Sequence, residues 1–259
     1  MRIVTWNING IKARLPVVKL WLEQHSPDIV CLQEIKSEDG SFPRGEFEDM
    51  GYNVETFGQK SWNGVAILSK TPFEEVNRGL PADDGDEQSR LIEGVFATEA
   101  GTVRVCNIYL PNGNPVDSEK FPYKLAWMDR LKSYVETRLA MEEPFVLLGD
   151  FNLIPTGADC HDPKAWWGDA LFREESLEKF RALSNLGLTD AVRSVTDAPA
   201  YTYWDFQSGA WRKDNGIRID HLMLSPQAAD RLNTVTIHRE ARGWDKPSDH
   251  VPVEGAFAF

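Results

Sequence analysis

The chain has 259 residues, of which 42% are hydrophobic and 26% are charged, a composition typical of a globular protein with one large domain or two small ones. It contains no apolar run of about 18 residues, so we expect no membrane-spanning helix. Its 28 basic and 40 acidic residues give a net charge of −12, which argues against a large non-specific surface for nucleic-acid phosphates but allows a local basic rim.

The first half of the chain is predicted to contain short strands and two helices. Apolar runs bounded by turn residues predict the strands, and apolar residues three and four apart predict the helices. In chain order we expect a strand at 2–6, a helix at 15–24, strands at 28–32, 52–57, 64–69, 91–98 and 102–110, and a helix at 120–141. The turn at 99–101 would join 91–98 and 102–110 as a hairpin.

A buried strand is predicted at residues 145–152, directly after the long helix. Four apolar residues between Pro144 and Gly149 lead into Asp150 and Asn152. Because side chains alternate along a strand, these two polar groups can point the same way at its carboxyl end, where open α/β sheets bind ligands. The alternative is that Asp150 only caps a tight loop.

The second half of the chain is predicted to be less regular. We expect an irregular stretch at 155–169, a helix at 177–186, a strand at 218–224, a helical turn at 226–231, and strands at 234–238 and 251–259. A helix followed by a strand that ends in an acid occurs twice, ending at Glu34 and at Asp150. With more strands than helices, we expect an α/β fold of two packed mixed sheets with helices outside, in a single domain over residues 1–259.

The N-terminus and the cysteines fit a cytoplasmic protein. The first residues enter a strand directly and lack the pattern of a signal peptide. Cys31, Cys106 and Cys160 are odd in number and widely spaced, and the first two lie in apolar runs, as reduced core residues do.

Polar residues gather at the predicted strand ends. They are Asn7, Glu34, Tyr109, Asp150, Asn152, Asp220, Asp249 and His250. Taken singly, each is best explained as a cap or turn residue, except that an acid inside an apolar strand, as Asp220 is, needs a partner. Taken together, their oxygen and imidazole groups suit Mg²⁺ or Mn²⁺ and a phosphoester reaction.

With these residues in place, the whole chain resembles the exonuclease III family of AP endonucleases, within the endonuclease/exonuclease/phosphatase superfamily. Six motifs in the family's order carry the resemblance: Trp6-Asn7-Ile8-Asn9-Gly10, Leu32-Gln33-Glu34-Ile35-Lys36, Tyr109-Leu110-Pro111-Asn112-Gly113, Gly149-Asp150-Phe151-Asn152, Arg218-Ile219-Asp220 and Lys246-Pro247-Ser248-Asp249-His250. The resemblance implies a four-layer α/β sandwich and Mg²⁺-dependent cleavage of a DNA phosphodiester.

The resemblance also implies a metal site. Glu34 would be the main metal ligand, with Asn7 and Asp249 close to the ion. Possible ligands at a second metal position are Asp150, Asn152 and His250. The sequence leaves open whether one or two metals bind.

Catalytic roles follow from the same resemblance. Asp150 would align or deprotonate the attacking water, or protonate the leaving 3′ oxygen, and Asn152 would orient it. His250, held by Asp220, would contact the scissile phosphate, and Tyr109 would touch the phosphate or act through its hydroxyl. Whether Asp150 or His250 is the general base stays open here. Donors aimed at a phosphodiester transition state stabilise its growing negative charge.

Substrate contacts are implied by shorter matches. The stretch Tyr201-Thr202-Tyr203-Trp204, with Ile217, resembles the part of the family that receives a flipped, base-free sugar. The alternative is that Tyr203 and Trp204 are core aromatics. Asn112 joins the substrate-binding set through its motif. Candidate phosphate contacts are Lys12, Arg14, Lys36, Lys60, Arg90, Arg212, Lys213, Arg218 and Lys246, each of which could equally be an ordinary surface residue.

Three further features receive no functional role. The stretch Cys160-His161-Asp162 lacks the repeated spacing of zinc modules and is expected to be a loop. The acidic residues 83–87 are expected to be a solvated connection. The pair Trp166-Trp167 is left unexplained, as either a brace for a DNA-facing loop or simple packing.

We therefore expect a DNA-repair nuclease that acts on double-stranded DNA, cuts 5′ of abasic sites and cleans blocked 3′ ends, with 3′→5′ exonuclease activity. We expect a monomer, because duplex DNA must reach the strand ends. One alternative is a phosphoesterase of the same superfamily that acts on an inositol phosphate or a sphingolipid. The acidic charge gives it some weight, but the Tyr109–Gly113 and Leu32–Lys36 motifs speak against it. The other alternative is a non-catalytic DNA- or protein-binding module on the same fold.

Overall fold

A computed structural model describes residues 1–81, 85–99 and 101–259, and within them the strands form two six-stranded sheets. The first sheet has the order β11 (Leu232–Ile237), β12 (Val253–Phe257), β1 (Arg2–Asn7), β2 (Ile29–Gln33), β4 (Val65–Ser69) and β3 (Asn53–Phe57). The second has the order β5 (Glu75–Arg78), β6 (Leu91–Thr98), β7 (Gly101–Tyr109), β8 (Phe145–Asp150), β10 (Asp220–Leu224) and β9 (Thr189–Asp190).

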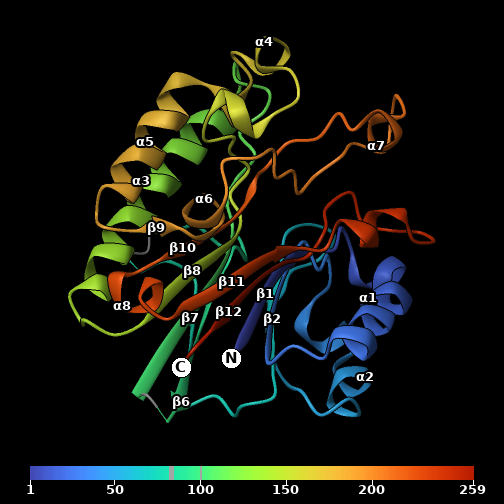
Figure 1. The fold of residues 1–259 in the computed structure, drawn as a ribbon, viewed down its shortest axis with the longest axis vertical. Helices are drawn as coiled ribbons and strands as arrows, with labels where there is room; N and C mark the ends of the chain where they lie inside the picture. Colours follow the sequence, from blue (N-terminus) through green and yellow to red (C-terminus); the bar gives the residue numbers. More distant parts are fainter. Residues whose placement is uncertain (82–84, 100) are drawn as a thin grey trace.

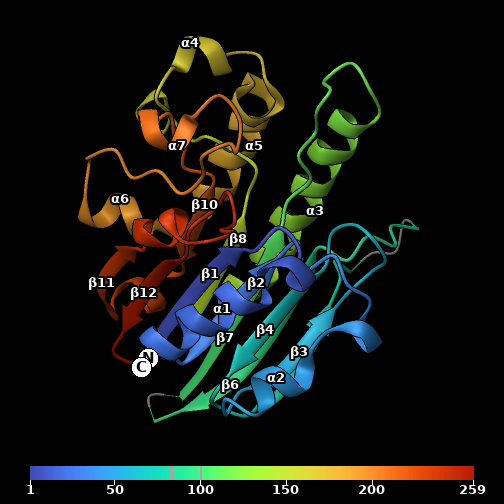
Figure 2. The same ribbon diagram turned by 90° about the vertical axis from the view of Figure 1, so that its right-hand side faces the viewer.

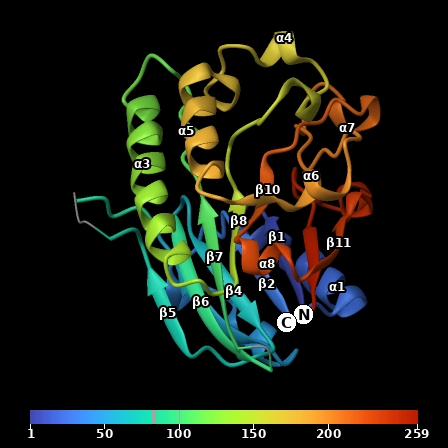
Figure 3. The ribbon, with the colours of Figure 1, turned by 60° about the vertical axis from the view of Figure 1, so that its left-hand side comes forward.

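Helices cover the outer face of each sheet, so the molecule has four layers (Figure 1). The first sheet carries α1 (Ile11–His25) and α2 (Arg44–Glu48). The second carries α3 (Lys120–Leu139) and α5 (Glu174–Ser184), which lie side by side (Figure 3). Shorter helical segments are α4 (Pro163–Trp166), α6 (Ala191–Val195), α7 (Ala210–Lys213), α8 (Pro226–Ala229), η1 (Asp39–Ser41), η2 (Gly157–Asp159), η3 (Ala170–Phe172) and η4 (Arg239–Gly243). The predicted α/β sandwich of two mixed sheets with helices outside is confirmed.

The apolar runs of the sequence are strands that are buried on both faces. Along β8, Phe145 and Leu147 pack toward α3 and α5, whereas Val146 and Leu148 pack toward the other sheet. Successive side chains of a strand point to opposite faces, so this one apolar run contributes side chains to two hydrophobic cores. The result is a central core between the sheets and an outer core under each helical layer.

The strand order brings the predicted polar residues to one end of both sheets. Parallel pairing of β1 with β2 sets Asn7 beside Gln33, the residue before Glu34. Parallel pairing of β7 with β8 sets Tyr109 beside Asp150, and antiparallel β10 sets Asp220 on the other side of Asp150. Figure 2 shows α4 and α7 toward one end of the sheets and both chain termini near the other.

The segment before β12 reaches this end because β12 runs antiparallel to β1. The indole of Trp6 donates a hydrogen bond to the carbonyl oxygen of His250 at 3.2 Å, and the hydroxyl of Ser248 donates one to the carbonyl oxygen of Asn7 at 2.7 Å. These bonds fix the loop that carries Asp249 and His250 against the end of β1.

Gly149 allows β7 and β8 to approach closely just before Asp150. Its φ is 146°, and a Cβ built there would lie 1.9 Å from the carbonyl oxygen of Ile108. Any larger residue would push the two strands apart. Glycine at this position therefore helps to set the separation of Tyr109 and Asp150.

Several predicted boundaries were wrong. The first helix begins at Ile11 rather than at residue 15, so Pro16 lies inside it rather than near its start. The strand predicted at 145–152 ends at Asp150, because Asn152 adopts a left-handed φ of 44°. β5 was missed because its sequence, Glu75–Arg78, shows no apolar alternation. The predicted hairpin of β6 and β7 is confirmed by its antiparallel register, while residue 100 of its turn and residues 82–84, which include part of the acidic stretch, lie outside the described residues.

No helix in the described part of the chain is long and apolar enough to cross a membrane.

Arg218 is a structural residue, so its predicted role as a candidate phosphate contact was wrong. Its side chain is fully buried. Its Nε donates to Asp159 Oδ1 at 2.6 Å and its Nη1 to Asp190 Oδ2 at 2.8 Å. Burial alone would raise the pKa of Asp159, but bonds and charge from Arg218, together with Arg193, lower it to about 2.

Replacing Asp159 by Ala should lower the free energy of unfolding by about 3–5 kcal/mol, because it leaves the buried guanidinium of Arg218 without its main partner. Urea denaturation at neutral pH measures this. The exposed pair Lys179–Asp129 supplies the control, since Asp129→Ala should cost no more than about 1 kcal/mol. The Asp159 contribution is present above its unfolded pKa of about 4 and is lost as pH falls through about 2, so the gap between wild type and variant should narrow over that range. Equal losses for the two variants would contradict this role.

Candidate active site

Asp150 lies at the centre of a buried polar network. Its Oδ2 accepts a hydrogen bond from Asn7 Nδ2 at 2.8 Å, and its Oδ1 accepts one from the backbone N–H of Asn152 at 2.8 Å. Burial raises the pKa of Asp150 above its usual range, and the facing His250 offsets this only in part. A carboxyl group raised toward neutral pH can both accept and release a proton.

Glu34 follows β2 directly and faces Asp150 across the seam between the sheets. Its Oε1 accepts hydrogen bonds from Asn7 Nδ2 at 3.0 Å and from the Tyr109 hydroxyl at 2.9 Å, and its Oε2 lies 2.8 Å from Lys36 Nζ. Burial opposes its charge, but Lys36 and the bond from Asn7 hold the pKa of Glu34 below its usual value. Its φ of 49° is left-handed, a strained conformation for a non-glycine residue that is found often at functional sites.

Tyr109 is a proton donor in this arrangement. Burial, followed by the negative charges of Glu34 and Asp150, raises the pKa of the Tyr109 phenol well above its usual value. The hydroxyl therefore stays protonated and keeps its bond to Glu34.

His250 and Asp220 form a buried pair beside Asp150. Nδ1 of His250 lies 2.9 Å from Asp220 Oδ2, which also accepts a hydrogen bond from the Thr202 hydroxyl at 2.6 Å. Nε2 of His250 lies 3.8 Å from Asp150 Oδ2. Burial disfavours the imidazolium, but the charges of Asp220 and Asp150 outweigh it and raise the pKa of His250. The ring is thus held in its charged form, with Nε2–H toward the cavity.

Lys124, on α3, was missed by the sequence analysis and supports the loops on which Asn112 and Asn152 lie. Its ammonium is fully buried and donates to the carbonyl oxygens of Asn112 at 3.1 Å and Asn152 at 2.6 Å. Asn112 Nδ2 in turn donates to Asn152 Oδ1 at 2.9 Å. Burial lowers the pKa of Lys124 to about 7. The detectable signal was a lysine on the apolar face of the helix, three residues after Phe121 and four before Met128.

These groups surround one cavity of about 340 Å³. Its lining consists of Glu34, Tyr109, Asn112, Asn114, Asp150, Asn152, Trp166, Asp169, Leu171, Tyr203, Ile219, Asp249 and His250. Nearly all of the polar residues predicted at strand ends are present, and Asn7 and Asp220 lie directly behind them through the bonds above. Trp166, which the sequence left unexplained, forms part of the wall.

The cavity fits a hard divalent cation. Four carboxylates line it, those of Glu34, Asp150, Asp169 and Asp249, so an anionic substrate would be repelled unless a cation shared the site. The ammonium of Lys36 already lies against Glu34 Oε2. Ligand atoms of Asp150, Asp220 and His250 lie within 4.8 Å of one another. Oδ1 of Asp220 is buried without a hydrogen-bond partner within the described residues. Oxygen-rich donors of this kind suit Mg²⁺ or Mn²⁺.

A second cavity of about 230 Å³ adjoins the first and shares Trp166 and Tyr203 with it. Ile217, His161 and Asn215 form part of its wall. Tyr203 packs against His250 with ring centroids 4.9 Å apart. The structure therefore places Tyr203 and Ile217 beside the reactive groups, at a spot large enough for a sugar.

Trp204 does not reach either cavity. It is fully buried, donates from its indole to Asp214 Oδ1 at 3.0 Å and packs edge-on against Trp211. Alternation explains this: Tyr203 pairs with Ile217 and His250 and faces the cavity, so the next side chain points away. The core interpretation holds for Trp204 in this structure.

The candidate cationic contacts lie outside the lining of the first cavity. The guanidinium of Arg90 lies 5.0 Å from the ring centroid of Tyr109 and donates to the carbonyl oxygen of Tyr109 at 3.1 Å. Arg90 thus braces Tyr109. Lys12 is exposed in the first turn of α1, where a long substrate could reach it.

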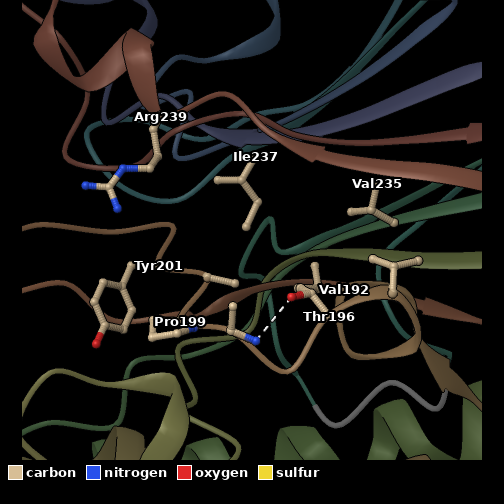
Figure 4. A pocket seen from close by; sticks show the side chains of 10 residues that line it. Val192, Thr196, Pro199, Tyr201, Val235, Ile237 and Arg239 are labelled. Atoms are coloured by element: carbon tan, nitrogen blue, oxygen red, sulfur yellow. Dashed lines mark hydrogen bonds between the residues drawn. The ribbon is translucent and has the colours of Figure 1, made fainter.

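A groove between α6 and β11 is unsuited to phosphate chemistry (Figure 4). Its volume is about 230 Å³, and its described lining carries no carboxylate. Apolar and aromatic side chains make most of the wall, among them Val192, Pro199, Tyr201, Val235 and Ile237. Arg239, its one charged residue, is paired with Asp214 at 2.9 Å.

Comparison with known proteins agrees with this geometry. A model described as the Endonuclease/Exonuclease/phosphatase family matches residues 4–250. Exodeoxyribonuclease III of Haemophilus influenzae is 34% identical over 266 residues, covering 99% of this chain and 100% of the relative.

Three solved structures are also similar over the full length of both chains. The 3′ phosphatase NExo from Neisseria, as an aspartate-to-asparagine variant bound to a product DNA hairpin, has a TM-score of 0.95 at 39% identity. Another structure of NExo, from Neisseria meningitidis, describes it as a 3′–5′ exonuclease. An AP endonuclease from Archaeoglobus fulgidus has a TM-score of 0.95 at 35% identity.

Proposed function

Because the chain belongs to the endonuclease/exonuclease/phosphatase family, we propose that it is a metal-dependent DNA-repair nuclease that hydrolyses the phosphodiester 5′ of abasic sites and clears blocked 3′ ends. The observation that carries the proposal is the cavity in which Glu34, Asp150 and His250 meet, with the smaller cavity beside it. The family match and the exodeoxyribonuclease relative confirm the resemblance drawn from the six sequence motifs.

The metal-ligand roles are part of this proposal. Glu34 would hold a Mg²⁺ ion, with Asn7 and Asp249 close to it. Asp150 and Asn152 would be available for a second position, and His250 would join them only after its ring loses the Nε2 proton. Mn²⁺ has the same ligand preference. When bound, the ion would polarise the phosphate and offset the negative charge of the four carboxylates.

The proton transfers are assigned to Asp150 and His250. Asp150, whose pKa burial raises, would take the proton of the attacking water or return one to the leaving 3′ oxygen. Asn152 would keep it in place through its backbone N–H. His250, held charged by Asp220, would donate from Nε2 to a phosphate oxygen. Tyr109 would donate from its hydroxyl. Each donor would stabilise charge that grows in the transition state.

The substrate assignment rests on the walls of the cavities. Tyr203, Trp166 and Ile217 would enclose an extruded, base-free deoxyribose. Asn112, on the rim, would contact the phosphate. Arg90 would act through Tyr109, and Lys12 would contact a backbone phosphate away from the cavity.

End processing is favoured by a separate observation, the similarity to NExo, whose structures are described by 3′ phosphatase and 3′–5′ exonuclease activities. Both activities attack a phosphoester at a 3′ oxygen, so the same donors would serve.

The proposal also covers the domain, the oligomeric state and the location of the protein. Residues 1–259 would form one catalytic domain, since both sheets supply the cavity, and it would act as a monomer on double-stranded DNA. The location would be cytoplasmic, which the three buried free thiols support.

Labelled duplexes carrying either one abasic site or one 3′-phosphate test this function, each with Mg²⁺ and with EDTA. We expect metal-dependent cutting 5′ of the abasic site and metal-dependent loss of the 3′-phosphate, with an undamaged duplex as control. Loss of the 3′-phosphate alone would restrict the enzyme to end processing. Phosphate release from inositol phosphates without any DNA cleavage would instead support the small-substrate phosphoesterase.

A further inference from the structure

A cluster of two histidines and a glutamate lies apart from the catalytic cavity, where the end of α1 meets the turn after β11. His25 is the last residue of α1, His238 follows β11, and Glu240 lies in the first turn of η4. Within the described residues it is one of two groups whose possible ligand atoms lie within 4.8 Å of one another, and the other is the catalytic group.

The three ligand atoms lie within 4.8 Å of one another. Glu240 Oε1 lies 3.2 Å from His238 Nδ1 and 3.9 Å from His25 Nε2. The two imidazole rings are inclined at 71° with their centroids 4.6 Å apart, so the edge of one ring meets the face of the other and the rings are not stacked. Separations of this size are close to those between ligands that share one ion at about 2 Å.

The surroundings hold these ligands in place. Trp21 stacks on the ring of His25 at 4.6 Å and lies edge-on to His238 at 5.1 Å. The other ring nitrogen of His238, Nε2, lies 3.5 Å from Glu254 Oε2. The two atoms are an ion-pair distance apart but are not aligned for a hydrogen bond. A carboxylate behind a metal-binding histidine is a common arrangement, because it orients the ring and increases its basicity.

The charge balance favours a cation. Glu240 and Glu254 are both acidic, and the facing cation, Arg2, is engaged by Glu254 through two bonds of 2.8 Å. Glu240 is 53% exposed, so an ion can enter from solvent and keep water as a further ligand.

We propose that His25, His238 and Glu240 form a second metal site that binds Zn²⁺, separate from the catalytic cation. Two imidazole nitrogens and one carboxylate oxygen match three-ligand zinc sites, whereas Mg²⁺ prefers oxygen ligands alone. Bound zinc would tie the end of α1 to the turn that leads into the loop of Asp249 and His250.

Titration of the metal-free full-length chain tests this site, with Zn²⁺ added in excess Mg²⁺ and with Co²⁺ as a visible-absorption probe. We expect one Zn²⁺ per chain with ligand-field absorption typical of tetrahedral Co²⁺. His25 and Glu240 are partly exposed, so their replacement should leave the fold intact. His25→Asn and Glu240→Gln should each weaken Zn²⁺ binding about tenfold or more, while DNA cleavage in Mg²⁺ stays at the wild-type level. His161→Asn, which alters an exposed histidine in the wall of the second cavity, is the control for zinc binding only.

The control should bind zinc as the wild type does. Unchanged affinity in both cluster variants would overturn the proposal, as would weakening by His161→Asn alone. Loss of zinc binding in Glu34→Gln with retention in His25→Asn would place the ion in the catalytic cavity and also overturn it. None of these outcomes depends on the enzyme being a DNA nuclease.

Discussion

Replacing Asp150 by Asn should lower kcat for DNA cleavage by about 100- to 10,000-fold, with a much smaller change in KM. The amide cannot take a proton from water. In the wild type, Asn7 Nδ2 and the backbone N–H of Asn152 both donate hydrogen bonds to the carboxylate, and the amide would lie against the same two donors. Whichever way the amide turns, its NH₂ group faces one of them. Single-turnover cleavage of the abasic duplex at saturating enzyme separates this loss of chemistry from a loss of binding.

Asp129→Asn is the matched control for that change. Asp129 is an exposed acid on α3 that lines neither cavity, and its carboxylate accepts hydrogen bonds from Lys179 Nζ at 2.6 and 2.7 Å. Its conversion to an amide should leave the single-turnover rate within a few-fold of wild type. If Asp150→Asn also kept that rate, proton transfer would have to be reassigned.

Replacing Lys124 by Met should lower kcat about 100-fold while the protein stays folded. The ammonium joins the carbonyl oxygens of Asn112 and Asn152, and a thioether of similar volume leaves both without a donor. The loops can then drift, and displacements of about 1 Å near reacting atoms cost rates of this order. The same change also removes the desolvation cost of a buried charge, which partly offsets the lost hydrogen bonds. The free energy of unfolding should therefore change by less than the activation free energy that corresponds to the fall in kcat.

Two measurements distinguish positioning from simple stability. Lys124→Arg, which restores a donor with a longer reach, should recover part of kcat, whereas Lys132→Met, at a partly exposed position paired with Glu136 on the same helix, should leave kcat unchanged. A Lys124→Met enzyme with full activity would show that the two loops hold their places without the ammonium.

The sequence predicted the groups that lie at strand ends. Asp150, Glu34 and Asn7 follow apolar runs, and the pairing of parallel strands brings such residues to one edge. The fold class followed from the same runs because strands buried on both faces give continuous apolar stretches. Residues outside this pattern were harder to place. Lys124 did not follow from the pattern, because apolar spacing identifies the buried face of a helix and gives no role to a single lysine within that face.

Other errors arose from contacts between distant parts of the chain. Arg218 resembled a phosphate contact until Asp159, 59 residues away in sequence, was found to hold it. Trp204 lies beside Tyr203 in sequence, yet strand alternation sends the two side chains to opposite sides, a distinction that required the bridge between Tyr203 and Ile217. Charge type alone could not reveal that Arg90 supports Tyr109.

The proposed reaction centre lies on the seam between the two sheets and draws residues from both. Asn7, Glu34, Asp249 and His250 come from the first sheet and its loops, while Tyr109, Asp150, Asn152 and Asp220 come from the second. Because Glu34 follows a strand of the first sheet and Asp150 ends a strand of the second, the distance between them is set by the apolar layer that separates the sheets. The cleavage rate should therefore depend on how tightly the two sheets pack against each other. On heating, activity should be lost when this packing loosens, before the chain as a whole unfolds.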